Sequence, residues 1–102
     1  MTVQWTALAL NHPREIKNYI AHDSPAAAQR TITNLVLKTR QLSRFPNSGP
    51  IVREHRGHRI QELVEDTYRI LYEIGSDHIF VLAVVHGRRD LRAFLRGITE
   101  RR

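Results

Sequence analysis

Residues 79–90 read IFVLAVVHGRRD. Residues 79–85 are apolar on both faces of an extended chain, which is typical of a strand buried in the middle of a sheet. The run is much shorter than the roughly 20 residues that a membrane-spanning helix needs. His86, Arg88 and Arg89 follow at once, so cations gather where this strand ends. We therefore expect a central strand whose end suits phosphate or an acidic protein.

The segments on either side of this strand predict its neighbours. Residues 75–77 (GSD) are typical of a hairpin turn, and residues 68–74 before them alternate as a second strand. Residues 58–63 predict a third strand, joined to the second through a tight turn at Glu65 and Asp66. The tail predicts a short amphipathic helix with apolar residues at helical spacing: Leu91, Phe94, Leu95 and Ile98.

The first half of the chain has a helical pattern. Ser24 followed by Pro25 is typical of an N-cap with proline at the first helical position, and this helix should run to about Arg44. Residues 46–50 (PNSGP) then end it. We expect its core-facing stripe to contain Ala28, Ile32, Leu35, Val36, Thr39 and Leu42.

A shorter helix should precede it. Residues 3–5 are a strand candidate, and Thr6 or Asn11 could cap the helix that follows. Because proline breaks a helix interior, Pro13 predicts either a helix that begins near Asn11 or an irregular first turn. The apolar face of this helix should contain Ile16, Tyr19 and Ile20.

The order of these elements predicts the fold class. It reads β-α-α-β-β-β-(α), an α+β fold with a mainly antiparallel sheet. Only residues 22–24 join the two helices, so they should form an antiparallel hairpin packed on one sheet face. We expect Trp5 in the core, Tyr19 and Tyr72 as packed rings, and Gly49 in a turn, because glycine tolerates positive φ.

Composition narrows the class of protein. The 102 residues are expected to form one domain, residues 1–102, without a disulfide, because the chain has no cysteine. A net charge of +6 favours anionic partners. The N-terminal residues lack the pattern of a signal peptide, which favours a cytoplasmic protein without membrane contact.

An ordered set of motifs resembles the RelE/ParE-type toxins of bacterial toxin–antitoxin systems. The set covers nearly the whole chain, with loops of fitting length. Its pieces lie in residues 3–6 (VQWT), 16–28 (IKNYIAHDSPAAA), 42–49 (LSRFPNSG), 62–63 (EL), 68–72 (YRILY) and 81–90 (VLAVVHGRRD).

One branch of this superfamily cuts mRNA on the ribosome. Such cleavage needs a base, an acid and cations, but no metal. The resemblance places Arg69 and His86 in this site, with Glu62 or Glu54 as the carboxylate. Gly87 stands where a tyrosine would be expected, so the catalytic set is incomplete.

The ParE branch fits better, because residues 86–90 (HGRRD) have its form. Its members inhibit DNA gyrase, so the chain would not be an enzyme. Arg69 would then be structural, paired with Glu62 or Glu73, and His86 would cap the strand end or hydrogen-bond a backbone group. The residues that contact the target or the antitoxin would be Arg88, Arg89, Arg92, Phe94 and Arg96.

The resemblance also implies a cognate antitoxin, which should cover the helical hairpin and part of a sheet edge. It implies no cofactor and leaves monomer and homodimer open. The histidine pair His55 and His58 has no third ligand at a suitable spacing, so we expect no metal site. Around this pair, a patch that could face phosphate is formed by Arg53, Arg56 and Arg59.

Overall fold

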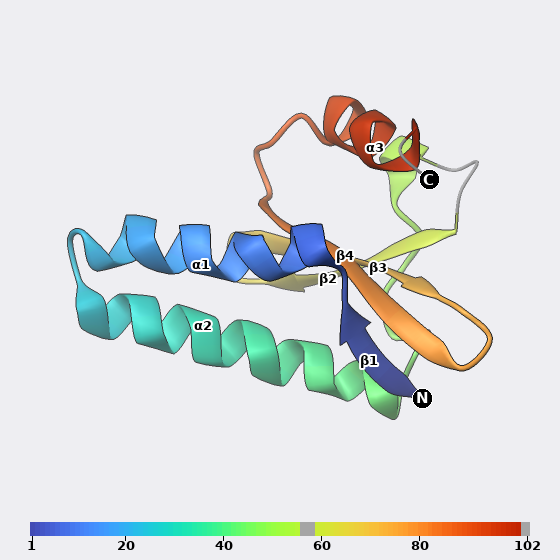
Figure 1. Ribbon diagram of the computed structural model, residues 1–102, viewed down its shortest axis with the longest axis horizontal. Coiled ribbons are helices and arrows are strands. Elements are labelled where there is room, and N and C mark those ends of the chain that lie inside the picture. The colour runs from blue at the N-terminus through green and yellow to red at the C-terminus, as the bar shows by residue number, and fades with distance from the viewer. Residues whose placement is uncertain (56–58, 101–102) are drawn as a thin grey trace.

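The strand β4 (His78–His86) runs through the interior of a four-stranded sheet with the order β1-β4-β3-β2 (Figure 1). The computed structural model describes residues 1–55 and 59–100. β1 (Thr2–Trp5) lies parallel to β4, while β3 (Tyr68–Ile74) lies antiparallel to it. β2 (Ile60–Glu65) pairs with β3 and forms the other edge. The predicted central strand and the mainly antiparallel sheet are confirmed.

Two long helices form the expected hairpin on one face of the sheet. α1 (Ala7–Ala21) and α2 (Pro25–Arg40) are joined by residues 22–24. The Ser24 hydroxyl accepts the N–H of Ala27 at 3.2 Å, so the predicted N-cap is confirmed. The 3₁₀ turn η1 (Gln41–Ser43) continues the helical half. In the described part of the chain, no helix is both long and apolar enough to cross a membrane.

The start of α1 differs from both expectations drawn from Pro13. The helix begins at Ala7, and Pro13 lies inside it. The Thr6 hydroxyl caps it by accepting the N–H of Ala9 at 3.1 Å, so the Thr6 alternative is the correct one. A proline inside a helix costs about 3 kcal/mol. Ala9 and His12, which precede Pro13 in the helix, are buried, and this packing stabilises the helix against that cost.

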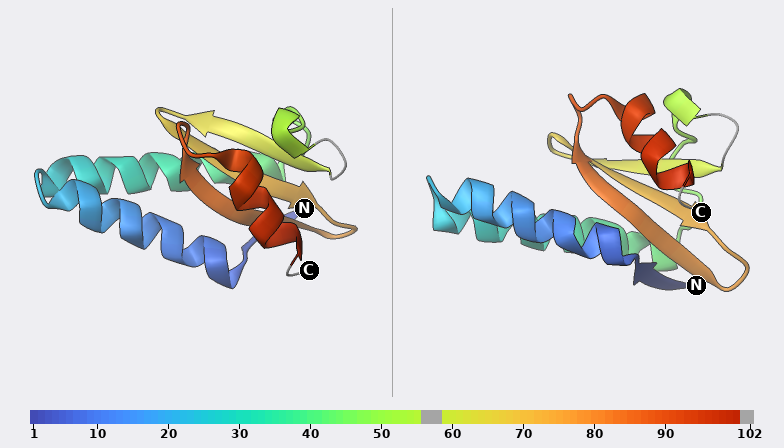
Figure 2. Two further views of the ribbon diagram at one scale, coloured as in Figure 1. Left: turned by 90° about the horizontal axis from the view of Figure 1, so that it is seen from above. Right: turned by 45° about the horizontal axis from the view of Figure 1, so that its top comes forward.

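Each face of the sheet has its own apolar core. The α1–α2 hairpin covers a core built around Leu35, Leu42, Ile70 and Tyr72. On the opposite face, α3 (Leu91–Glu100) and the 3₁₀ turn η2 (Arg53–His55) lie together (Figure 2). The second core contains Val52, Ile60, Leu71, Leu82, Ala83, Val85, Leu91 and Leu95. The predicted amphipathic tail helix is confirmed; its Leu91 and Leu95 lie in this core and Phe94 packs partly buried against it.

Two of the expected core positions are wrong. The side chain of Tyr19 is 82% exposed, and that of Val36 is 37% exposed. Tyr19 lies near the closing end of the hairpin, which extends past the sheet (Figure 1). Helical spacing identifies a face, but it does not show how far along that face the sheet reaches. Trp5 packs partly buried against the first core, as expected.

Tyr72 fastens the loop after η1 to the sheet. Its ring is fully buried, and its hydroxyl donates to the carbonyl of Pro46 at 2.9 Å. The same oxygen accepts the N–H of Gly49 at 3.0 Å, and the Gln61 amide donates to the Gly49 carbonyl at 2.8 Å. The prediction of a packed Tyr72 ring is therefore confirmed.

Gly49 is required for a different reason from the one predicted. Its φ is not positive; among the described residues only Asp66, in the β2–β3 turn, has a positive φ, of 55°. A Cβ atom on Gly49 would lie 2.0 Å from the backbone oxygen of Glu62. The loop backbone approaches β2 so closely that only glycine fits.

Candidate functional site

Arg69 lies on β3 between two carboxylates. Its Nε donates to Glu62 at 2.8 Å, and Nη1 and Nη2 donate to Glu54 at 2.8 and 3.2 Å. Nη2 also contacts the same oxygen of Glu62. The pairing with Glu62 was one of two predicted partners, and Glu54 from η2 completes the cluster. All three guanidinium nitrogens therefore donate within the protein.

The electrostatics of this cluster follow from the ion pairs. Hydrogen bonds from Arg69 hold the pKa of Glu54 below its ordinary value, and the positive charge of Arg92 on α3 contributes. The bonds to Glu54 and Glu62 raise the pKa of Arg69 against the effect of burial. Two carboxylates exceed one guanidinium, so the cluster itself does not attract phosphate.

His86 lies on the other face of the sheet from Arg69. It is directly opposite Tyr68, and the two rings meet edge to face with centroids 5.8 Å apart. Arg69 is opposite Val85, whose side chain belongs to the second core. Residues opposite each other share a face, and successive residues alternate between faces. The structure thus brings Glu62 to Arg69 but places His86 away from both.

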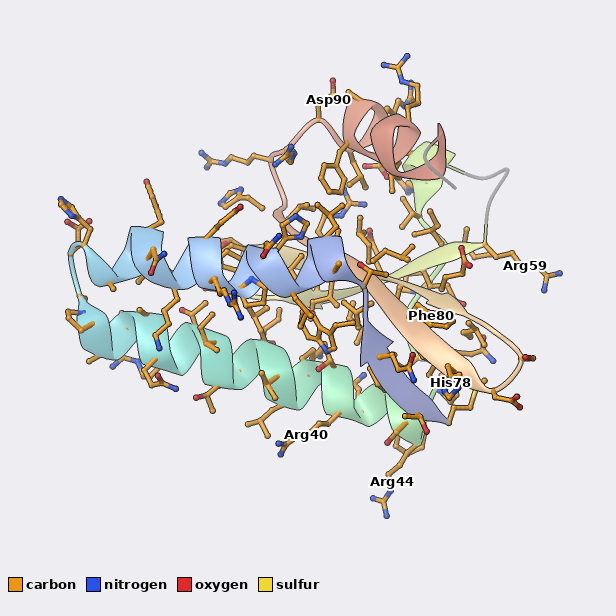
Figure 3. The ribbon with its side chains drawn as sticks, in the orientation of Figure 1. Arg40, Arg44, Arg59, His78, Phe80 and Asp90 are labelled. Atoms are coloured by element: carbon orange, nitrogen blue, oxygen red, sulfur yellow. The ribbon has the colours of Figure 1, made fainter. Side chains whose placement is uncertain are left out.

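The ring of His86 also closes the strand end. Its Nδ1 accepts the N–H of Arg88 at 3.1 Å, which matches the expected hydrogen bond to a backbone group. The backbone then turns, with the N–H of Arg89 donating to the carbonyl of His86 at 3.0 Å. This turn leads to Asp90, whose carboxylate caps α3 through the N–H of Ala93 at 3.2 Å (Figure 3).

A groove of about 330 Å³ lies between α1 and the end of β4. Apolar and aromatic side chains line it together with both signs of charge. Burial raises the pKa of Tyr68, so this phenol remains protonated at neutral pH. The lining residues are His12, Glu15, Ile16, Tyr19, Tyr68, Val84, Val85, His86 and Arg89.

His12 joins α1 to the strand at the floor of this groove. Its Nδ1 accepts the N–H of Val84 at 3.0 Å, and burial lowers its pKa. The Phe94 ring lies 5.9 Å from the His12 ring and carries the Arg89 guanidinium 4.5 Å above its centroid. Arg89 is therefore held by a cation–π contact, which ties α3 to the groove.

The other predicted basic residues are spread over the surface. Arg88, Arg92 and Arg96 are exposed on the loop after β4 and on α3. Arg53 is exposed on η2, and Arg59 points away from the body of the protein before β2 (Figure 3). Arg56 and His58 lie outside the described residues, so the predicted phosphate patch and histidine pair are described only in part. Within the described ranges, no three His, Cys, Asp or Glu residues group as metal ligands.

Sequence reasoning did not single out three residues of the groove: His12, Glu15 and Tyr68. His12 and Val84 are 72 positions apart, and no motif links them. A histidine on the apolar side of a helix was the available signal, but the adjacent Pro13 indicated a break in the helix at this point.

The comparisons with known proteins agree with this architecture. A solved structure titled "Chromosomal ParDE TA system from P. aeruginosa" superposes with a TM-score of 0.69 at 17% identity, covering 84% of this chain and 95% of the other. The two chains therefore share one fold. "Putative toxin Y4kP" of Sinorhizobium fredii (strain NBRC 101917 / NGR234) is 34% identical over 90 residues, which cover 86% of this chain and 90% of the relative.

The family follows from the sequence match. Residues 3–91 match the family described as "ParE toxin of type II toxin-antitoxin system, parDE". The chain belongs to this ParE toxin family.

Proposed function

We propose that this toxin inhibits DNA gyrase and so blocks replication in the cytoplasm, and that a cognate antitoxin neutralises it. The observation that carries the proposal is the enclosure of Arg69 by Glu54 and Glu62. An arginine held in this way cannot stabilise a phosphorane without first losing its carboxylate partners. With His86 on the other sheet face, the three residues proposed for mRNA cleavage do not form one site.

The contact surface for the target is proposed on the loop after β4 and on α3. Arg88 and Arg92 are exposed, and Arg89 is oriented by Phe94. These side chains flank one end of the molecule without belonging to either core. They suit an acidic protein surface, on which arginine can pair with carboxylates in a bidentate way.

The test is inhibition of purified gyrase in a supercoiling assay. The variant that changes both Arg88 and Arg89 to Ala should lose at least about tenfold in inhibition, because two charge-assisted contacts disappear. A matched control removes two exposed helical arginines, Arg14 and Arg30, and should inhibit as the unchanged toxin does. Normal supercoiling with the unchanged toxin would refute the proposal.

The groove supports ribonuclease activity as a second candidate function. His86, Tyr68 and Arg89 line one cavity and could supply a base, an acid and a cation. This set differs from the one that the sequence predicts, because Tyr68 takes the place of the tyrosine missing at position 87. Cleavage of mRNA on programmed ribosomes that is lost in Tyr68→Phe would favour this function over gyrase inhibition.

The antitoxin is proposed to cover the α1–α2 hairpin and part of a sheet edge. The net charge of +6 favours an acidic binding segment, and the exposed Leu10 and Leu37 offer apolar contacts on the two helices. Mixing purified toxin with the antitoxin encoded beside it should restore supercoiling. Protection from limited proteolysis confined to residues 1–5 would contradict the proposed surface.

A further inference from the structure

β1 accompanies β4 for only part of its length. Residues 2–5 of β1 pair with residues 78–81, and the chain then turns into α1. Beyond that point, groups from the start of α1 replace the strand. The N–H of Thr6 donates to the Val81 carbonyl at 3.0 Å, and its hydroxyl donates to the Leu82 carbonyl at 3.4 Å. His12 accepts the N–H of Val84, so α1 continues the hydrogen bonding of the missing strand.

Two further backbone groups of β4 point toward the same side. In an antiparallel ladder, the N–H and C=O of every second residue point away from the partner strand. The N–H of Val84 is directed away from β3 to His12, so its carbonyl is directed that way too. By the same alternation the N–H of His86 points outward. Across the described residues, the hydrogen bonds on this side of β4 leave the Val84 carbonyl and the His86 N–H open.

We propose that the antitoxin adds a short parallel strand to this open edge of β4. The inference rests on the proposed function, because it names how the antitoxin engages the toxin. One residue of the added strand would lie opposite Val85, donate its N–H to the Val84 carbonyl and accept the N–H of His86. Main-chain pairing of this kind binds an extended segment at a sheet edge.

The bonds already present select the parallel direction. An antiparallel partner bonds to both the N–H and the C=O of one residue. At Val84 the N–H is taken by His12, and at His86 the carbonyl accepts the N–H of Arg89. A parallel partner needs only the carbonyl of Val84 and the N–H of His86, and both of these groups are open. The added strand also continues the direction of β1.

The residues that line the groove indicate which side chains the added antitoxin strand should carry. The residues before and after the paired one would face the groove, where Ile16 and Tyr68 favour apolar groups. A parallel strand leaves the groove beside the turn that carries Arg88 and Arg89. Those two cations exceed the single carboxylate of the lining, Glu15. The segment should therefore contain apolar residues followed by aspartate or glutamate.

Proline at position 86 removes the N–H on which the added strand depends. Proline fits a strand edge where the N–H points outward, and the preceding extended residue is compatible with it. His86→Ala is the matched control, because it removes the ring but keeps the N–H. With the purified antitoxin encoded beside the toxin, His86→Pro should bind at least about tenfold more weakly than His86→Ala, which measures the effect of losing the ring alone. Equal affinity of the two variants would overturn the inference.

Amide hydrogen exchange on the unchanged toxin gives an independent measurement that decides the matter even if His86→Pro fails to fold. The His86 amide should exchange at least about 100-fold more slowly in the complex, while the Val84 amide, already bonded to His12, should change little. An unprotected His86 amide, or protection by gyrase and not by the antitoxin, would overturn the inference. If the antitoxin relieves gyrase inhibition without protecting His86, only the inference fails. If the antitoxin does not bind at all, the proposed function fails with it.

Discussion

At the scale of single residues, Arg69 has the environment of a structural ion pair, because two carboxylates hold its guanidinium. It bridges η2 and β2, because Glu54 and Glu62 come from these two elements. Part-buried ion pairs of this kind become costly when one partner is removed, since the remaining charges stay desolvated. Arg69 therefore holds the chain around residues 53–55 against the sheet.

The Arg69→Gln variant tests this structural role. Its free energy of unfolding near neutral pH should fall by about 2–4 kcal/mol, because two carboxylates are left close together without a cation. Arg69 keeps the pKa of Glu54 below its ordinary value of 4.5, so the stabilisation is present above that pH and is lost as the pH falls through the lowered pKa. Urea unfolding should show a difference between the two proteins that shrinks in acid. A difference that stays constant with pH would contradict the ion-pair explanation.

Gly49 makes the second prediction at this scale. Gly49→Ala would place a Cβ 2.0 Å from the backbone oxygen of Glu62 and 2.9 Å from the Tyr72 hydroxyl. The loop must move and lose hydrogen bonds to Tyr72, so unfolding free energy should fall by about 3 kcal/mol. Gly97→Ala is the control, since nothing lies within 4 Å of its added Cβ, and it should raise helix stability by up to about 1 kcal/mol. Thermal unfolding of both variants measures the contrast.

At the scale of elements, local sequence signals predicted whether a segment forms a helix, strand or turn better than they predicted where that element begins. The Ser24-Pro25 cap, the hairpin at residues 75–77 and the apolar β4 strand all have short-range causes, and the structure contains each of them. Thr6 was one of the two caps predicted for α1, and local signals left the choice open because Thr6 is held by Val81 and Leu82, far away in the sequence.

The candidate site shows the same division between local and long-range causes. The Arg69–Glu62 pair was expected from adjacent strands, whereas the separation of Arg69 and His86 depends on the pairing of β3 with β4. The alternation of side chains along a strand shows which residues share a sheet face only when the register between the strands is known. A groove built from α1, β3 and β4 could not be assembled from motifs alone.

His12 provides the prediction at the scale of elements. Protonation of Nδ1 would remove the acceptor for the Val84 N–H and place a charge beside Arg89. Because burial lowers its pKa in the folded protein below the ordinary 6.5, the unfolded chain binds the proton first. The free energy of unfolding should therefore decrease as the pH falls below about 6.5. His12→Asn keeps an acceptor for Val84 but does not titrate, and should remove this part of the pH dependence in urea unfolding. An unchanged pH profile in His12→Asn would assign the effect to another histidine.

At the scale of the whole molecule, one sheet separates two cores. The turn that carries Arg88 and Arg89 lies where the chain passes from one face of the sheet to the other. The hairpin covers the first core and α3 covers the second, while the turn at residues 87–90 passes from β4 to α3. Arg89 contacts Phe94 from this turn, and Phe94 contacts His12 of α1. The helices on both faces therefore meet beside the open edge of β4. A partner bound there would touch both layers at once.

The net charge of +6 leads to the last prediction, on the rate at which the toxin meets its antitoxin. Long-range attraction to an acidic segment accelerates association, and salt screens it as the Debye length falls from about 10 Å at 0.1 M to about 3 Å at 1 M. The association rate measured by stopped-flow should fall at least about tenfold over this range, with a much smaller change in the dissociation rate. Changing both Arg88 and Arg89 to Gln lowers the net charge by two and should flatten the salt dependence. Changing the exposed Arg44 and Arg59 to Gln instead gives the same net charge away from both the groove and the α1–α2 hairpin. A salt dependence equal in the two double variants would mean that overall charge, and not the end of β4, steers the encounter.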